Sequence, residues 1–248
     1  MGHRLRLLPI FLLAALPAIA TARAEPLVAD LSNHLIAITT GFTGADVLLF
    51  GATDGPGDIV AVVRGPTGRA IVRRKGRLFG IWVNKDATDF EEVPNFYAVA
   101  SSRPLDQLLT PEMAQHYRVG LDNLGIRPAE GGPAAAEDAM LTALIDIKKT
   151  ERLYRPAPGK VVFLGGQLFR ADFHFPANVP TGTYLIEVML VRNGKVESAQ
   201  TTPLVVSKIG VGADIFEFAQ RHSAAYGVVA ILSALMAGWF AHLAFRRS

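Results

Sequence analysis

Residues 46–63 read DVLLFGATDGPGDIVAVV, and this stretch decides the predicted fold. Two short runs rich in aliphatic, β-branched and aromatic residues, 46–50 and 58–63, flank the cluster TDGPG at 53–57. Glycine, proline and aspartate at these positions are typical of a turn, and the flanking runs are typical of β-strands. The stretch therefore predicts two strands joined by a turn.

Runs of the same kind lie on both sides of this stretch. They are residues 34–38, 70–73, 78–83 and 96–100, and the predicted turns between them are 41–44, 65–68, 75–76 and 84–86. Short strands at such regular spacing are typical of a β-sandwich or a barrel. Residues 25–103 are therefore predicted to form a β-rich domain.

The periodicity becomes helical after residue 103. Thr110 is a predicted N-cap, followed by Pro111 at the first helical position. The first predicted helix buries Met113, Tyr117, Leu121 and Leu124 and stops at Gly125, and the second opens at Glu137 and buries Met140, Leu144 and Ile147. Residues 104–154 are therefore predicted to be a helical insert that packs on the β-rich body.

Strand signals return in residues 155–207. The predicted strands are 161–164, 168–175, 182–191 and 202–206, and RNGK at 192–195 is a predicted hairpin turn. These strands either form a second module or complete the first sheet. The predicted fold class is mainly β, with a sandwich-like exported region, a helical insert and one C-terminal transmembrane helix.

The two ends of the chain read as targeting and membrane segments. Residues 1–24 resemble a signal peptide, with Arg4 and Arg6 before an apolar run and Ala22-Arg-Ala24 as the cleavage site. Residues 222–245 carry no full charge and would be about 35 Å long as a helix, enough to cross a bilayer. Residues 208–221 are a predicted juxtamembrane helix.

The orientation of this span follows from its flanks. Arg246 and Arg247 follow it directly, and positive charge favours the cytoplasmic side. We therefore expect a single-pass bacterial inner-membrane protein with its bulk in the periplasm and residues 246–248 as a cytoplasmic tail. Ala230, Ala234 and Gly238 share one face of the span, where another helix could approach, although small residues are common in membrane spans.

The charge distribution argues against nucleic-acid binding. The whole chain has a formal net charge of +3, but residues 25–220 hold 19 basic and 22 acidic residues, a net of −3. The exported part therefore lacks the basic footprint that nucleic-acid binding needs. The chain has no cysteine, which excludes disulfides and thiol chemistry and favours a bacterial periplasm.

One basic cluster stands out in the exported region. It consists of Arg69, Arg73, Arg74, Lys75 and Arg77, around a predicted hairpin. Such a cluster could meet an anionic ligand, lipid headgroups or an acidic partner, or it could be an ordinary charged hairpin tip. The nearby aromatic residues Trp82 and Phe96 are predicted to lie in the core. An exposed aromatic beside arginine would instead indicate a recognition surface.

No residue pattern indicates catalysis, a cofactor or a metal. The six histidines are not at ligand spacing, and no nucleophile elbow or phosphate-binding glycine loop occurs. The acidic residues Asp86, Asp89, Glu91 and Glu92 match no EF-hand and are interpreted as a solvated turn. We therefore expect no enzyme activity.

Several motifs together resemble one known family. They are GFTGADVLLFG at 41–51, VRRK at 72–75, GIWVN at 80–84, FY at 96–97, LFRAD at 168–172 and PTGTY at 180–184. They are similar to an uncharacterised alphaproteobacterial family of single-span transmembrane proteins. The resemblance implies an inner-membrane, periplasm-facing protein, and it points to a neighbouring permease of the sulfite-exporter type as a partner. It implies no catalytic residue.

Two functions from different classes fit these observations. The first is a membrane-anchored periplasmic interaction or accessory protein, whose tether confines its partner to the same membrane and which could support a transporter. The alternative is a periplasmic small-ligand or ion-binding component of a transport system, which requires a concave pocket with converging polar groups.

Overall fold

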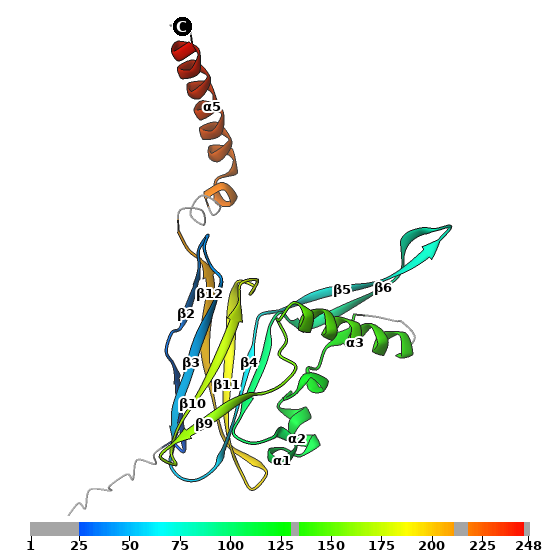
Figure 1. Cartoon of the computed structure of the whole chain (residues 1–248), viewed down its shortest axis with the longest axis vertical. Coiled ribbons are helices and arrows are strands. Elements are labelled where there is room, and N and C mark those ends of the chain that lie inside the picture. The colour runs from blue at the N-terminus through cyan, green and yellow to red at the C-terminus, as the bar shows by residue number, and fades with distance from the viewer. Residues whose placement is uncertain (1–24, 130–133, 211–217, 246–248) are drawn as a thin grey trace, which may run out of the picture.

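The β-rich part of the chain is built around one curled β-sheet (Figure 1). The computed structural model describes residues 25–129, 134–210 and 218–245. Within these residues the large sheet has nine strands in the order β1-β3-β10-β9-β7-β4-β11-β12-β2. The strands are β1 (Leu27–Leu31), β2 (Leu35–Ile38), β3 (Gly44–Thr53), β4 (Asp58–Arg64), β7 (Tyr97–Ser101), β9 (Gly159–Leu164), β10 (Leu168–Pro176), β11 (Gly182–Arg192) and β12 (Lys195–Lys208). The predicted mainly-β fold class is confirmed.

Strands from both ends of the sequence alternate in this sheet. β9 and β10 lie between β3 and β7, while β11 and β12 continue outward from β4. The curl brings β1 beside β12, where the Gln200 side chain bonds both backbone groups of Ala29 at 2.8 and 2.9 Å. Residues 25–103 and 155–207 therefore share one folded body, and their buried faces form a common core.

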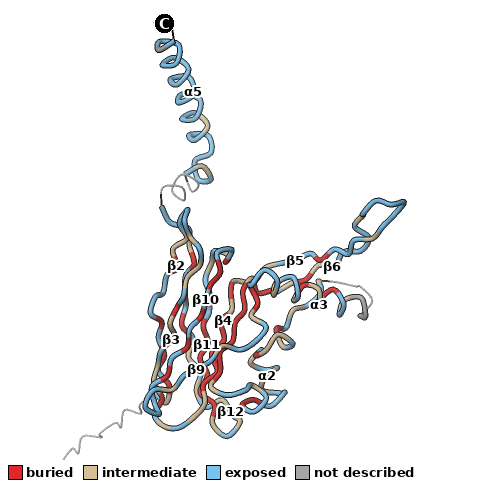
Figure 2. Tube along the Cα trace, in the orientation of Figure 1, coloured by how far each residue is buried: buried red, intermediate tan, exposed pale blue. Residues whose placement is uncertain are grey.

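The core occupies the inside of the curl and one outer face of it. β1 and β10 alternate buried and exposed residues, as expected for strands with one solvated face. β4 and β7 are instead buried along nearly their whole length, because helical-insert residues such as Leu108, Leu124 and Leu153 cover their second face. Figure 2 shows this continuous buried trace in the middle of the body.

Three aromatic rings connect the two halves of the curled sheet. Phe96 stacks on Phe175 with ring centroids 4.9 Å apart, and Tyr184 lies against both at 5.8 and 5.7 Å. All three side chains are buried. The prediction that Phe96 belongs to the core is therefore correct.

The first predicted helix of the insert is shorter and more broken than predicted, whereas the second begins earlier, at Ala134. It contains α1 (Leu105–Leu108), α2 (Pro111–His116), the 3₁₀ turn η1 (Leu121–Asn123) and α3 (Ala134–Thr150). Thr110 caps α2 as predicted, accepting a hydrogen bond from the Met113 amide at 3.3 Å. However, α2 ends at His116, because Arg118 and Gly120 take positive φ angles of 51° and 96° and turn the chain.

The buried stripe of α3 also differs from the prediction at one position. Met140 and Leu144 are buried, whereas Ile147 is 49% exposed. Met140 and Leu144 pack on the base of a long hairpin, but Ile147 lies beyond that contact.

That hairpin is formed by β5 (Thr67–Leu78) and β6 (Ile81–Pro94), with the short β8 (Arg127–Pro128) paired to β6. It projects from the body, and we call it the arm (Figure 1). The predicted turns at 75–76 and 84–86 are wrong, because both segments lie inside the paired strands β5 and β6. The turn is at Phe79-Gly80, and so the predicted strand 78–83 is the end of the arm.

The predicted membrane segment is a single continuous helix, α5 (Ser223–Phe245). The predicted signal peptide at residues 1–24, the tail at 246–248 and residues 211–217 of the predicted juxtamembrane helix lie outside the described residues. Phe218 to Arg221 are helical, as predicted, but residues 208–210 are not, because Lys208 is the last residue of β12.

Candidate functional site

The arm is fixed to the body at its base. Val72 and Phe90, on facing strands of the arm, pack with Val93 against Met140 and Leu144 of α3 in a small apolar cluster. This cluster is separate from the main core. It holds the direction of the arm, so the far end is carried on a defined support rather than on a loose loop.

Backbone and side-chain hydrogen bonds secure the root of the arm. The Gly65 amide donates to the Phe96 carbonyl and the Asn95 amide to the Pro66 carbonyl, both at 2.9 Å. The buried Tyr154 hydroxyl donates to the Pro94 carbonyl at 2.7 Å. The hairpin therefore leaves the body from a site where its two strands are already joined.

The far end of the arm turns through two residues in the left-handed region. Phe79 has φ 48° and Gly80 has φ 82°, and Leu78 pairs with Ile81 across them. A two-residue turn with both φ angles positive favours Asn-Gly or Gly-Gly. A phenylalanine at its first position is therefore not selected by the backbone geometry.

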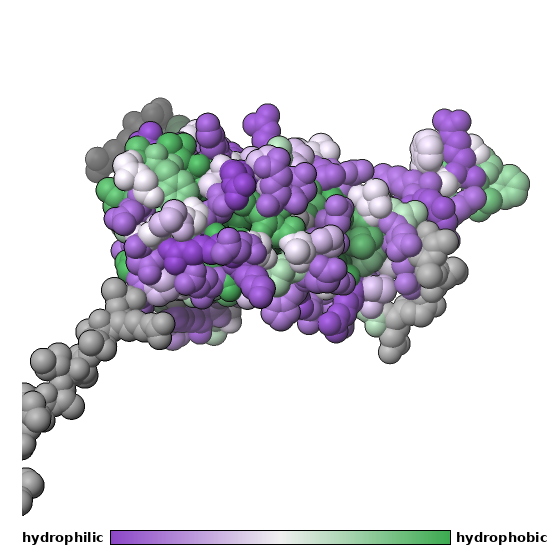
Figure 3. Space-filling view, turned by 90° about the horizontal axis from the view of Figure 1, so that it is seen from below, coloured by the Kyte–Doolittle hydropathy of each residue, from purple (hydrophilic) through white to green (hydrophobic). Residues whose placement is uncertain are grey.

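The end of the arm exposes large apolar side chains. Phe79 is 97% exposed and Trp82 is 61% exposed, and Leu78 and Ile81 beside them are also exposed. We call these four residues the apolar tip. Figure 3 shows it as a green end on an otherwise purple projection. The prediction that Trp82 lies in the core is wrong, because the tip lies too far from the body to contact the core.

Basic side chains lie directly behind the apolar tip. The distal half of the arm, residues 73–86, carries Arg73, Arg74, Lys75, Arg77 and Lys85 and a single carboxylate, Asp86. Arg74 binds Asp86 at 2.5 Å, and the Arg77 guanidinium lies 5.1 Å from the Trp82 ring centroid. Among the described residues, Arg73, Lys75 and Lys85 make no ion pair.

Acidic side chains lie toward the base of the arm. Arg69 is bonded to Glu91 there, and this hydrogen bond raises the pKa of the Arg69 guanidinium. Glu92 lies 4.0 Å from Arg118 of the helical insert. The four residues interpreted as an acidic turn therefore lie in strand β6, and three of them are paired with arginines.

The structure thus divides the predicted basic cluster. Arg73, Arg74, Lys75 and Arg77 lie together in the distal half, while Arg69 is tied to the base. The apolar tip was missed, because LFGIWV at 78–83 reads equally well as a buried strand. The signal that could have found it is Phe79-Gly80, a residue pair with glycine at the second of the two turn positions that need positive φ.

A hollow lies between loops of the body. A cavity of about 770 Å³ is bounded by the β3–β4 turn, the β11–β12 turn and α1. Its charged lining residues are Asp54, Asp58, Arg103 and Arg192, which balance in formal charge. This volume lies within the range of about 300–1,000 Å³ typical of small-ligand sites.

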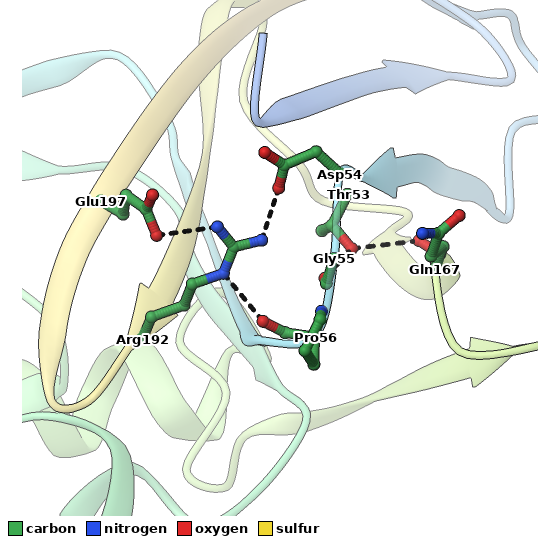
Figure 4. Close-up of polar contacts among 7 residues, drawn as sticks. All are labelled: Thr53, Asp54, Gly55, Pro56, Gln167, Arg192 and Glu197. Atoms are coloured by element: carbon green, nitrogen blue, oxygen red, sulfur yellow. Dashed lines mark hydrogen bonds and ion pairs between the residues drawn. The ribbon is translucent and has the colours of Figure 1, made fainter. Parts of the chain in front are cut away.

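The guanidinium groups of this cavity already have partners. Arg192 donates to the Pro56 carbonyl at 2.8 Å and binds Glu197 at 2.9 Å and Asp54 at 2.5 Å (Figure 4). Arg103 is bonded to Asp58, and this bond lowers the pKa of the Asp58 carboxyl. An anionic ligand would have to displace a carboxylate from each arginine, so these groups mainly connect the loops.

The remaining predicted residues belong to other elements. Ala230, Ala234 and Gly238 lie exposed on α5, and helix pairing through them stays a prediction. Within the described part of the chain, no three His, Cys, Asp or Glu side chains are grouped as metal ligands. Absence of enzyme activity likewise stays a prediction.

One described helix is long and apolar enough to cross a membrane. Its candidate span is Ser223–Leu243, and no residue of this span is buried against the rest of the chain. No curated protein matches the chain. A family model described as "Putative transmembrane protein (Alph_Pro_TM)" matches residues 26–247, which is nearly the whole chain. The chain therefore belongs to this alphaproteobacterial family of transmembrane proteins.

Proposed function

We propose that this protein is a membrane-anchored accessory module that uses its arm to dock on a target at the same membrane. In this proposal the leader exports the body to the periplasm, α5 anchors it in the inner membrane, and a permease is one class of target. The observation that carries the proposal is the apolar tip, which lies away from the body on a hairpin packed against α3 at its base and is flanked by cations.

The exposure of the four apolar side chains at the tip is best explained by binding to a target. A single exposed leucine or isoleucine is ordinary, but four large apolar side chains at one end of a projection form a patch. The tip is absent from both apolar clusters and so gives the fold no packing. Aromatic and arginine side chains are also the types that most often dominate binding energy at contact surfaces.

The alternative function is small-ligand binding in the cavity between the β3–β4 and β11–β12 turns. Its volume fits, but its arginines are engaged by carboxylates and its lining contains no aromatic side chain. The arm therefore supports docking better than the cavity supports ligand capture.

Site-specific photo-crosslinking in living cells tests this function. A photoreactive residue is placed at Ile81, in the apolar tip, or at Ile147, which is also an exposed isoleucine but lies on α3. We expect an adduct at position 81, to lipid or to protein, and none at position 147. Equal labelling at the two positions would show that the arm is no special contact surface and would overturn the proposal.

A further inference from the structure

We propose that the target of the arm is the anionic surface of the bilayer that holds α5, so that the apolar tip inserts among lipid headgroups as a second membrane contact. This inference rests on the proposed docking function and names its partner class. Four observations carry it: where the arm leaves the body, how far it reaches, the order of its side chains, and their distribution around the hairpin.

The arm and the membrane anchor leave the body from the same end. β4 and β12 both pair antiparallel with β11, so they run in the same direction. β4 ends at Arg64 and leads into the arm, and β12 ends at Lys208 and leads toward α5. Figure 1 shows both departures on the same side of the sheet. The arm therefore begins at the membrane-proximal end of the body.

The lengths of the connecting segments allow the tip to reach the bilayer. β5 has 12 residues, which span about 40 Å at about 3.4 Å per residue. Lys208 and Phe218 are ten residues apart in the sequence, so covalent geometry limits their separation to about 35 Å. The arm is therefore at least as long as the greatest separation that this segment allows between β12 and Phe218, and a body tilted toward the membrane would bring the tip to the bilayer.

The side chains follow the order of a membrane surface. The apolar tip comes first, and Arg77, Lys75 and Arg73 follow within six residues behind it. Tryptophan is favoured at the membrane interface, and long basic side chains place their charges among the headgroups while their stems cover apolar surface. The acidic residues Asp89, Glu91 and Glu92 are confined to the base, away from an anionic surface.

The apolar side chains surround the end of the hairpin instead of forming one face. Leu78 pairs with Ile81, and the next pair, Arg77 with Trp82, points to the opposite side of the ribbon. A protein groove would cover one of these sides and leave the other in water. A lipid surface surrounds an inserted tip on every side, and so it suits this arrangement better.

Fluorescence of Trp82 in reconstituted full-length chain tests the inference. The chain has two tryptophans, so Trp239→Phe leaves Trp82 as the reporter. This variant is placed in vesicles of phosphatidylcholine, or of phosphatidylcholine mixed with phosphatidylglycerol, each with and without brominated acyl chains. We expect blue-shifted emission and bromine quenching in the anionic vesicles, and weaker quenching in the neutral ones.

Variants that remove positive charge from the arm or from the body test the role of the basic residues. Arg73→Gln, Lys75→Gln and Arg77→Gln together should lower the ratio of inserted to free arm about a hundredfold, at about fivefold for each cation. The control changes Lys160, Arg170 and Lys195 to glutamine, which removes the same charge from exposed positions on the body. It should leave the quenching unchanged. Added salt should weaken insertion in the parent, because the Debye length falls from about 30 Å at 0.01 M to about 8 Å at 0.15 M.

The possible results separate this inference from the proposed function. Unquenched, water-like Trp82 emission in anionic vesicles overturns the lipid inference, and so does quenching that ignores both lipid charge and the triple change. If position 81 then crosslinks to a protein, docking by the arm stands with a protein target. If position 81 gives no specific adduct either, the proposed function fails as well.

Discussion

The β11–β12 hairpin and the β5–β6 arm use the same turn for different purposes. Asn193 and Gly194 have φ angles of 52° and 73°, and Phe79 and Gly80 have 48° and 82°. The first pair is a residue combination that this turn favours, and its strands belong to the nine-stranded sheet of the body. The second places a phenylalanine in solvent at the end of strands that leave the body.

The two hairpins also differ in what their side chains contact. In β11 the side chains of Tyr184, Ile186 and Val188 are fully buried and help to form the main core. In the distal half of the arm, by contrast, no side chain belongs to the main core. The arm should therefore tolerate substitutions that would unfold the body. Its sequence should be constrained by binding to a target and not by folding.

The largest expected effect compares one isoleucine from each hairpin. Ile186→Ala in β11 removes a fully buried side chain and should lower the free energy of unfolding by about 3–5 kcal/mol, through lost burial and a cavity. Ile81→Ala in the arm should change it by less than about 0.5 kcal/mol. Denaturant unfolding of the full chain in detergent micelles measures both. Comparable losses would show that the tip packs against the body.

A smaller effect is expected at the boundary between the two regions. Leu144→Ala opens the small cluster of α3 with the base of the arm, which should cost about 2–3 kcal/mol. The loss should concentrate in the arm, so amide exchange should speed up in β5 and β6 more than in β11. Ile147→Ala, on the same helix but exposed, is the control. Uniform faster exchange throughout the chain would mean that the arm and body unfold as one unit.

Alkaline pH should destabilise the body first, and it should reach the arm only through Tyr154, whose hydroxyl donates to the Pro94 carbonyl at the root of the arm. Burial raises the pKa of Tyr97 to about 12 and also raises the pKa values of Tyr154 and Tyr184, whereas the arm contains no tyrosine. A raised folded-state pKa gives stability that is complete below the unfolded value near 10 and is lost as the pH rises further. Tyr97 alone should therefore cost about 2 kcal/mol between pH 10 and 12.

The control for this pH dependence is Tyr97→Phe. The Tyr97 hydroxyl donates to the Arg118 carbonyl at 3.0 Å and accepts from the Gly120 amide at 2.8 Å. The variant should therefore be less stable than the parent at neutral pH, but its stability should fall less steeply above pH 10. A parallel fall in both proteins would assign the alkaline loss to the other tyrosines.

The body was more predictable than the arm for a physical reason. In β10 and β11, alternation or continuous burial reflects contacts made along the whole strand, so the sequence pattern carries the fold. The paired strands β5 and β6 were instead divided at Lys75-Gly76 and at residues 84–86, because local turn signals outweighed a weak alternation of charged residues. The pairing of β5 with β6 along the whole arm, which no local pattern shows, holds these strands together, and β8 and α3 contact them only at the base.

The sequence predicted the charged residues of the candidate site but not its exposed apolar residues. Clustered arginines and lysine are visible in the sequence whether they are folded or not, so Arg73, Arg74, Lys75 and Arg77 could be named. An apolar run such as LFGIWV gives the same signal for burial and for exposure. Only the length of the arm, and hence its distance from any core, shows that Trp82 faces solvent.

The smallest expected effect exchanges the first turn residues of the two hairpins. Phe79→Asn supplies the residue that a turn with two positive φ angles favours, so it should stabilise the arm by less than about 1 kcal/mol. Asn193→Phe makes the reverse change in the body and should destabilise the β11–β12 hairpin by a similar amount. Slower amide exchange in the arm of the Phe79→Asn variant would check the gain. The same variant should lose Trp82 quenching in anionic vesicles, because it removes the most exposed apolar side chain of the tip. Reduced arm stability in Phe79→Asn would instead show that the Phe79 ring packs within the arm. The apolar residues of the tip would then be explained by folding and not by binding to a target.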